Sequence, residues 1–203
     1  ELGVRQEAAG TASLEVRPAS GAASGERLLG RDFAVVCASN FLVYFSVYLI
    51  VPVLPVFLEG KGYTNSLIGA LMSMATVAAL LRPLFGRLAD RKGRRYMLLA
   101  GSLLLGASTE LYTAFGSALP LFFVRFLNGL GLAAFHTAAY AVIGDLAPSS
   151  RRLQAIAVFY ISLDATIGIA PPLAQAIQKA SGYATVYFLA GVAVMLAFLL
   201  SLT

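Results

Sequence analysis

One short basic segment, residues 86–95 with the sequence GRLADRKGRR, constrains the fold of this chain more than any other stretch. It lies between two long apolar runs, and it combines five basic residues with the single acid Asp90. Charged side chains are costly in the hydrocarbon of a membrane. The segment must therefore lie in water, as the connection between two membrane-spanning helices.

The composition agrees with a membrane protein. Hydrophobic residues make up 59% of the chain, charged residues only 12%, and the mean hydropathy is +0.79. A soluble domain needs far more charge to cover its surface. The formal net charge of +5 does not indicate a nucleic-acid partner, because the basic residues lie in the connections between apolar runs. The single cysteine, Cys37, excludes a disulfide within the chain and a cysteine-type metal site.

Six apolar runs are each long enough to cross a bilayer as a helix. We therefore predict an all-α integral membrane fold, a six-transmembrane-helix bundle over residues 31–203, preceded by a disordered cytoplasmic tail at 1–30. Prolines 52 and 55 should kink the first span, and Pro171 with Pro172 should interrupt the fifth. The chain begins without Met and stops after an apolar run, so we expect a fragment of a longer protein. The predicted helices cover about 33–58, 67–85, 96–115, 120–143, 153–177 and 183–202.

The distribution of Lys and Arg predicts the orientation. Eleven of these residues fall in the amino-terminal region and the connections on its side, whereas only Lys61 and Lys179 fall on the other side. Basic loops are retained in the cytoplasm. The amino terminus and the 86–95 loop should therefore be cytoplasmic in a multi-pass protein of the plasma membrane, the inner membrane of a bacterial cell.

Polar residues within the spans indicate where chemistry can occur. In the fourth span, Arg125, Asn128, Leu132, His136 and Tyr140 share a helical face by the 3.6-residue period. Such a face either joins helices through buried polar contacts or lines a cavity. For Asn128 alone we favour the structural role. For Arg125, Asn128 and His136 together we favour the cavity.

In the fifth span, Tyr160, Asp164, Gly168, Pro171 and Gln175 share a face, and Asp164 is the only carboxylate deep within a span. Burial favours the protonated form of a carboxyl group, which suits a proton carrier. An ion pair between Asp164 and Arg125 is the structural alternative, and both remain open.

The first and third spans add weaker candidates. Asn40, Tyr44 and Tyr48 in the first span lie roughly on one face, either for packing or for lining a cavity. Glu110 in the third span lies nearer a helix end, where its side chain is expected to reach the outer surface.

Enzyme chemistry is not expected. His136 has no second ligand at metal spacing on its own helix, so no metal site is predicted. No serine or cysteine nucleophile comes with a base, and no glycine-rich phosphate loop follows a strand, so no cofactor is predicted either.

Three segments resemble the major facilitator superfamily. Residues 86–95 resemble the signature that links the second and third helices of that family. Residues 121–131 (LFFVRFLNGLG) are similar to its fourth-helix pattern. Residues 168–174 resemble a weakened fifth-helix antiporter motif, with Ala170 and Ala174 in place of the expected glycines. The resemblance covers Asp32 to Thr203, the amino-terminal six-helix half of a twelve-helix transporter.

The physical chemistry of the basic segment is compatible with a moving joint. Gly86 and Gly93 permit tight turns. Asp90 can face the positive end of a helix, or pair with Arg94 four residues on. Asp145 and Arg151 on the same side can join such a network. The alternative is a plain cluster of charges that stops membrane insertion.

The resemblance implies a function and a set of partners. It implies secondary transport of a small solute by alternating access, with proton-coupled efflux as the mode. Partners would be the lipid bilayer, the solute, protons, and the carboxy-terminal half or a second copy. Two alternatives remain open, a short self-associating half-transporter and a non-transporting membrane scaffold. The residues that would form a cytoplasmic latch are Gly86, Asp90, Arg91, Gly93, Arg94, Arg95 and Asp145.

Overall fold

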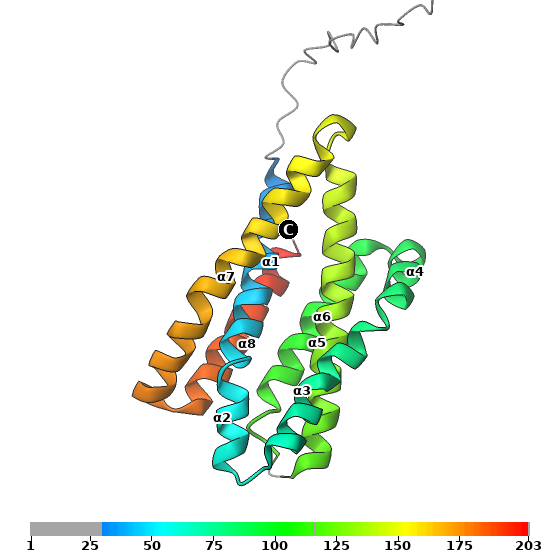
Figure 1. Cartoon of the computed structure of the whole chain (residues 1–203). Coiled ribbons are helices and arrows are strands. Elements are labelled where there is room, and N and C mark those ends of the chain that lie inside the picture. The colour runs from blue at the N-terminus through cyan, green and yellow to red at the C-terminus, as the bar shows by residue number, and fades with distance from the viewer. Residues whose placement is uncertain (1–29, 116, 203) are drawn as a thin grey trace, which may run out of the picture.

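The computed structural model describes residues 30–115 and 117–202, and this part of the chain is helical without β-strands. The predicted tail at residues 1–30 lies, except for Gly30, outside the described residues. The helices are α1 (Arg31–Ile50), α2 (Val53–Gly60), α3 (Asn65–Ala79), α4 (Arg82–Lys92), α5 (Arg94–Glu110), α6 (Ala118–Leu146), the short η1 (Ser149–Arg151), α7 (Arg152–Ser181) and α8 (Tyr183–Leu200) (Figure 1).

Four helical stretches in the described chain are long and apolar enough to cross a membrane. They are Arg31–Gly60, Ala118–Leu146, Ser149–Ser181 and Tyr183–Leu200. A fifth arises when α3 and α4, which are bent by 41° relative to each other, count as one broken span. Helix α5 has 17 residues, fewer than the roughly 20 that a bilayer requires. The fold is thus all-helical with long apolar helices, and the count of six spans stays a prediction.

Prolines act differently in the first predicted span, which is α1 with α2, and in the fifth, which is α7. Helix α1 ends at Ile50 and α2 begins at Val53, so the break falls at Pro52. The predicted interruption at Pro171 and Pro172 is wrong, because α7 continues through both as one helix of 30 residues. Each proline removes one backbone hydrogen bond. The fully buried Ala170 flanks the pair and packs in the core, which holds the helix in place.

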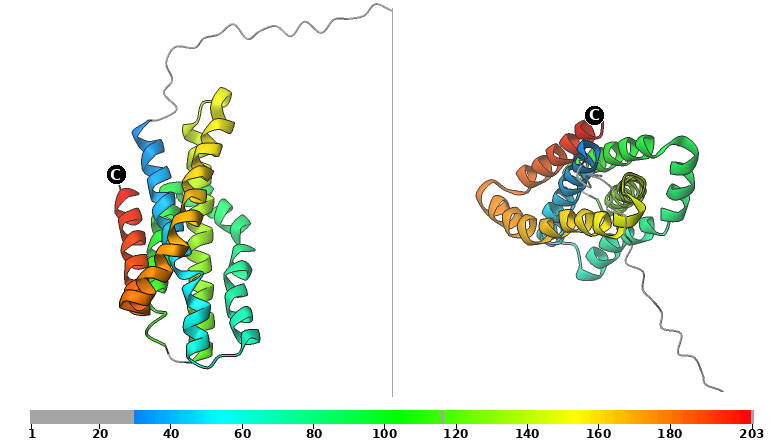
Figure 2. Two further views of the ribbon diagram at one scale, coloured as in Figure 1. Left: turned by 60° about the vertical axis from the view of Figure 1, so that its left-hand side comes forward. Right: turned by 90° about the horizontal axis from the view of Figure 1, so that it is seen from above.

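Helix α6 organises the bundle. It contacts α1, α3, α4, α5 and α7, and the views in Figure 2 show it surrounded by the other helices. Helix α1 packs between α7 and α8, and α8 packs against α5. Seen from above, α5 and α8 lie along one side of the bundle and α7 along the other (Figure 2).

Glycines, which have no side chain, let α6 approach its neighbours closely. A Cβ atom added to Gly131 would lie 2.6 Å from the backbone nitrogen of Leu105 and 2.9 Å from the carbonyl oxygen of Gly101, so α5 and α6 touch through their backbones. A Cβ on Gly129 would lie 2.7 Å from Cα of Ala75 in α3. Small residues at a crossing are typical of membrane helices, where close packing replaces the hydrophobic effect.

Candidate functional site

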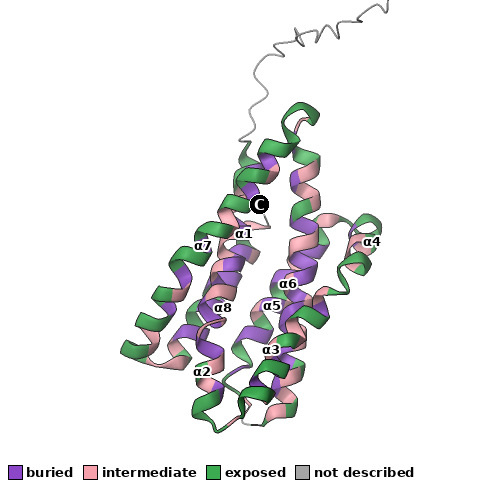
Figure 3. Ribbon diagram, in the orientation of Figure 1, coloured by how far each residue is buried: buried purple, intermediate pink, exposed green. Residues whose placement is uncertain are grey.

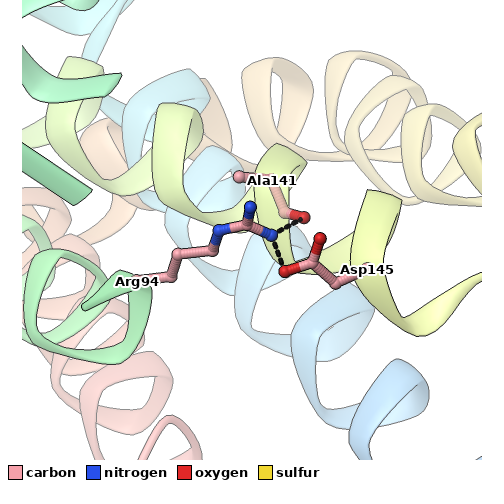
Figure 4. A network of polar contacts seen from close by, with 3 residues as sticks. All are labelled: Arg94, Ala141 and Asp145. Atoms are coloured by element: carbon pink, nitrogen blue, oxygen red, sulfur yellow. Dashed lines mark hydrogen bonds and ion pairs between the residues drawn. The ribbon is translucent and has the colours of Figure 1, made fainter. Parts of the chain in front are cut away.

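The junction between α4 and α5 is made by Gly93. Its φ of +95° lies in a region that residues with a side chain rarely adopt, so Gly93 ends one helix and starts the next. Arg94 follows directly and points toward α6. Its Nη1 donates a hydrogen bond of 2.7 Å to the carbonyl oxygen of Ala141 and forms an ion pair with Asp145 (Figure 4). The basic segment is thereby fastened to the end of α6.

The predicted pairing within the segment differs from the observed one. Asp90 and Arg94 do not pair, because α4 stops at Lys92 and the turn at Gly93 removes the helical register that an i, i+4 pair needs. Arg94 pairs with Asp145 instead, and Arg151 takes no part in that ion pair. The other predicted residues of the segment lie around this contact: Gly86 is half-buried, Asp90, Arg91 and Gly93 are exposed, and Arg95 donates to the carbonyl oxygen of Leu202.

A second polar cluster lies between α5 and α6. Asn128 is buried, and its Nδ2 donates to Ser108 Oγ at 3.3 Å and Thr109 Oγ1 at 3.2 Å. Arg125, only 6% exposed, reaches the hydroxyl of Tyr112 at 3.4 Å and Oδ1 of Asn128 at 3.5 Å. Two of these partners, Ser108 and Thr109, belong to α5, and Tyr112 lies in the turn that follows it. None of the three was predicted, although hydroxyl residues close together at the end of an apolar span are a usable signal.

A third cluster is aromatic and joins α1, α6 and α7. The ring of His136 lies 5.7 Å from that of Tyr44, 6.0 Å from Phe159 and 6.4 Å from Tyr160. Tyr140 adds an edge contact to Tyr160 at 6.3 Å. The Nε2 atom of His136 is buried without a hydrogen-bond partner in the described part of the chain.

The fourth predicted span is α6, and the polar face predicted for it does not line one single site. Asn128 contacts α5 and Arg125 contacts Tyr112 in the turn after it, whereas His136 contacts residues of α1 and α7.

Asn40 connects α1 to α7. It is fully buried, and its Nδ2 donates to Ser162 Oγ at 3.0 Å and to the carbonyl oxygen of Phe159 at 3.4 Å. Its Oδ1 has no partner among the described residues. Asn40 thus fixes α7 at the level of the aromatic cluster.

The carboxylate of the fifth span was predicted to be buried, and this is wrong. Asp164 is exposed on α7, as are Tyr160 and Gln175. The alternative ion pair with Arg125 is also absent among the described residues. Gln175 lines a cavity of about 310 Å³ between α2 and the ends of α7 and α8, together with Pro52, Lys179 and Tyr183.

Metal chemistry has no support in the described residues, where no three His, Cys, Asp or Glu side chains come together. The polar side chains differ in burial. Arg125 and Asn128 are enclosed beside α5, although Nε of Arg125 has no hydrogen-bond partner among the described residues, whereas Asp164 and Gln175 on α7 are exposed.

Comparison with known proteins places the chain in a family. The profile of the Major Facilitator Superfamily matches residues 36–203. The chain is 24% identical over 175 residues to the quinolone resistance protein NorA of Staphylococcus aureus. That alignment covers 86% of this chain and 45% of NorA. It is 29% identical over 168 residues to the multi-drug resistance efflux pump PmrA of Streptococcus pneumoniae, covering 80% of this chain and 42% of PmrA.

A solved structure shows the same fold. A peptide transporter crystallised with sulfate superposes with a TM-score of 0.75 at 21% sequence identity, covering 88% of this chain and 38% of that transporter. The chain thus spans about half the length of the relatives that it matches. With the family profile matching most of its length, this chain belongs to the Major Facilitator Superfamily and is a multi-pass membrane protein.

Proposed function

We propose that this chain is the amino-terminal half of a secondary transporter that exports a small solute by alternating access, driven by proton exchange. The family and its efflux-pump relatives support export. The chain's share of those relatives, 45% and 42%, supports a role as one half. Solute sites of such transporters lie near the bilayer midplane between the two halves.

One observation carries the proposal, namely the low burial of α7, whose exposed surface includes the polar side chains of Asp164 and Gln175. In the most apolar window of the Ser149–Ser181 stretch only 22% of the residues are buried, against 50% in α6. Figure 3 shows the contrast, with exposed residues along α7 and buried residues along α6. Asp164 and Gln175 are exposed on this apolar helix. A carboxylate facing lipid is costly, so this face must meet water or a second set of helices.

The residues on and near α7 can be assigned roles in proton transfer, in lining the pathway and in helix packing. Asp164 is the proton carrier, because it is the exposed carboxylate of the spanning part of α7. Tyr160, Tyr44 and His136 form the adjoining wall of the pathway. The buried Arg125 and Asn128 hold α5 to α6 and do not line the pathway.

The Arg94–Asp145 contact is the cytoplasmic latch of this scheme. The segment lies in the cytoplasm by the excess of basic residues on its side. The exposed Asp90 and Arg91 are free to engage the second half. Arg94, the first residue of α5, is held by Asp145 of α6 and so fixes the chain beside them. The bond of Arg94 to a backbone carbonyl keeps this support in place when the second half moves away.

A transport assay tests the carrier role. In the complete transporter, Asp164→Asn should abolish solute-driven proton movement while solute still binds, because the amide cannot carry a proton. Glu59→Gln serves as the matched carboxylate control, since Glu59 is exposed near the end of α2, outside the pathway and the basic segment, and should keep the ratio of protons to solute. Unchanged coupling in Asp164→Asn refutes the role of Asp164 and leaves the transporter assignment intact.

Cysteine labelling tests whether the α7 face is wet. With Cys37 replaced by serine, a cysteine at Asp164 or Gln175 should react with a water-borne thiol reagent. A cysteine at Met195, exposed on the apolar side of α8, should not react. Equal labelling of Asp164→Cys and Met195→Cys would contradict a water-lined pathway along α7.

A further inference from the structure

A groove lies between α5 and α8. Seen from above, the two helices lie along one side of the bundle and α7 along the other (Figure 2). The volume of the groove is about 320 Å³, within the range of small-molecule sites. The groove exists because Gly106 and Gly191 have no side chains, while Leu103, Met195 and Phe198 form apolar walls. Glu110 is the only charged residue that lines it.

The carboxyl group of Glu110 lies at the middle of α8. A Cβ atom added to Gly191 would overlap Oε1 of Glu110, so the carboxyl rests against the backbone there. Gly191 is the ninth residue of a helix of 18 residues, which at 1.5 Å per residue spans roughly 27 Å. Glu110 is the last residue of α5, as expected, and its exposed side chain lies along α8 and lines the groove.

The groove opens toward hydrocarbon. The large exposed side chains of α8 are all apolar: Phe188, Leu189, Val192, Met195, Leu196 and Leu199. The described residues offer the Glu110 carboxylate no hydrogen bond and no ion pair. A carboxyl group at this depth ionises only beside a positive partner, so a cation is the ligand that would stabilise its charged form. The headgroup of a phospholipid remains at the membrane surface and is not placed to supply one.

We propose that this groove binds a lipophilic amine from within the membrane, its apolar body between Leu103 and Met195 and its ammonium group on the carboxylate of Glu110. Charge complementarity selects this occupant over a neutral amphiphile, because only a cation offsets the unpartnered carboxylate. The site is separate from the α7 face and does not depend on the proposed transport function.

Fluorescence quenching tests the proposal directly, because the chain has no tryptophan of its own. The variant Leu103→Trp places a reporter in the groove wall, and Leu196→Trp places one on the same apolar side outside the groove. The full chain is reconstituted in neutral phosphatidylcholine vesicles, and brominated dodecylamine is compared with brominated dodecanol. We expect half-quenching of the groove reporter at about tenfold less amine than alcohol, and equal values for the outer reporter.

Two variants in the Leu103→Trp background show whether the carboxylate is responsible. Glu110→Gln keeps the shape and should remove the tenfold preference for the amine. Gly191→Ala displaces the Glu110 carboxyl group from its position against α8, so it should reduce that preference although the acid remains. The proposal is overturned if amine and alcohol quench equally in the parent, as they would if a neutral amphiphile or a second copy filled the groove. It is also overturned if Glu110→Gln keeps the preference for the amine over the alcohol. The same holds if the outer reporter, Leu196→Trp, shows a tenfold preference for the amine.

Discussion

The closest helix crossing in the bundle gives a quantitative prediction for Gly131→Ala. The new Cβ would lie 2.6 Å from the backbone nitrogen of Leu105, whereas carbon contacts are favourable at about 3.5 to 4.0 Å. Backbone atoms cannot turn aside, so α5 and α6 must separate by roughly 1 Å at this point. Overpacking of this kind costs about 1 to 3 kcal/mol. The separation would also stretch the hydrogen bonds of Asn128 to Ser108 and Thr109.

Alanine also favours the helix over glycine by about 1 kcal/mol, which partly masks the steric cost. Gly144→Ala is the control that removes this contribution, because Gly144 lies on the same helix with no atom within 4 Å of its added Cβ. Unfolding by SDS in mixed micelles should therefore show Gly131→Ala less stable than Gly144→Ala by about 1 to 3 kcal/mol. Equal stability of the two variants would refute the backbone contact between α5 and α6.

Two further predictions concern polar contacts between helices. In a double-mutant cycle, Arg94→Gln and Asp145→Asn should couple by no more than about 1 kcal/mol, since the Asp145 side chain is 62% exposed. A coupling that does not fall with added salt would contradict an exposed ion pair. Asn40→Ala should destabilise the chain by about 1 to 3 kcal/mol through its lost bond to Ser162. Ser46→Ala, at a buried hydroxyl without a partner among the described residues, should be nearly neutral, and an equal loss in both variants would count against the Asn40 bond.

The all-helical fold could be predicted from the sequence because it depends on local quantities. Apolar length sets the helices, and Pro52 and Gly93 set two of their ends. The double proline of α7 shows the limit of local reasoning. Pro171 weakens the helix in any sequence, yet α7 stays continuous, and the neighbouring Ala170 and Ala174 are buried against other helices. That packing depends on residues far away in the chain.

The candidate site was harder to predict because a helix face does not identify its neighbour. Arg125 and His136 lie three turns apart on nearly the same side of α6, as predicted. Eleven residues at 1.5 Å each separate them by roughly 16 Å along the axis. Over that distance the neighbour changes from α5 to α1 and α7, so the two side chains join different clusters. Only the three-dimensional crossing of helices contains this information.

The same reasoning separates polar residues that stabilise the bundle from those that need something outside it. Asn128 satisfies its amide group on α5, so it is a fixed part of this chain. Asp164 sits on a spanning helix of the same bundle with its side chain open. A carboxylate in that position is tolerated only beside water or a partner. Because relatives of this chain are about twice as long, the proposed function assigns that partner surface to a second half that faces α7.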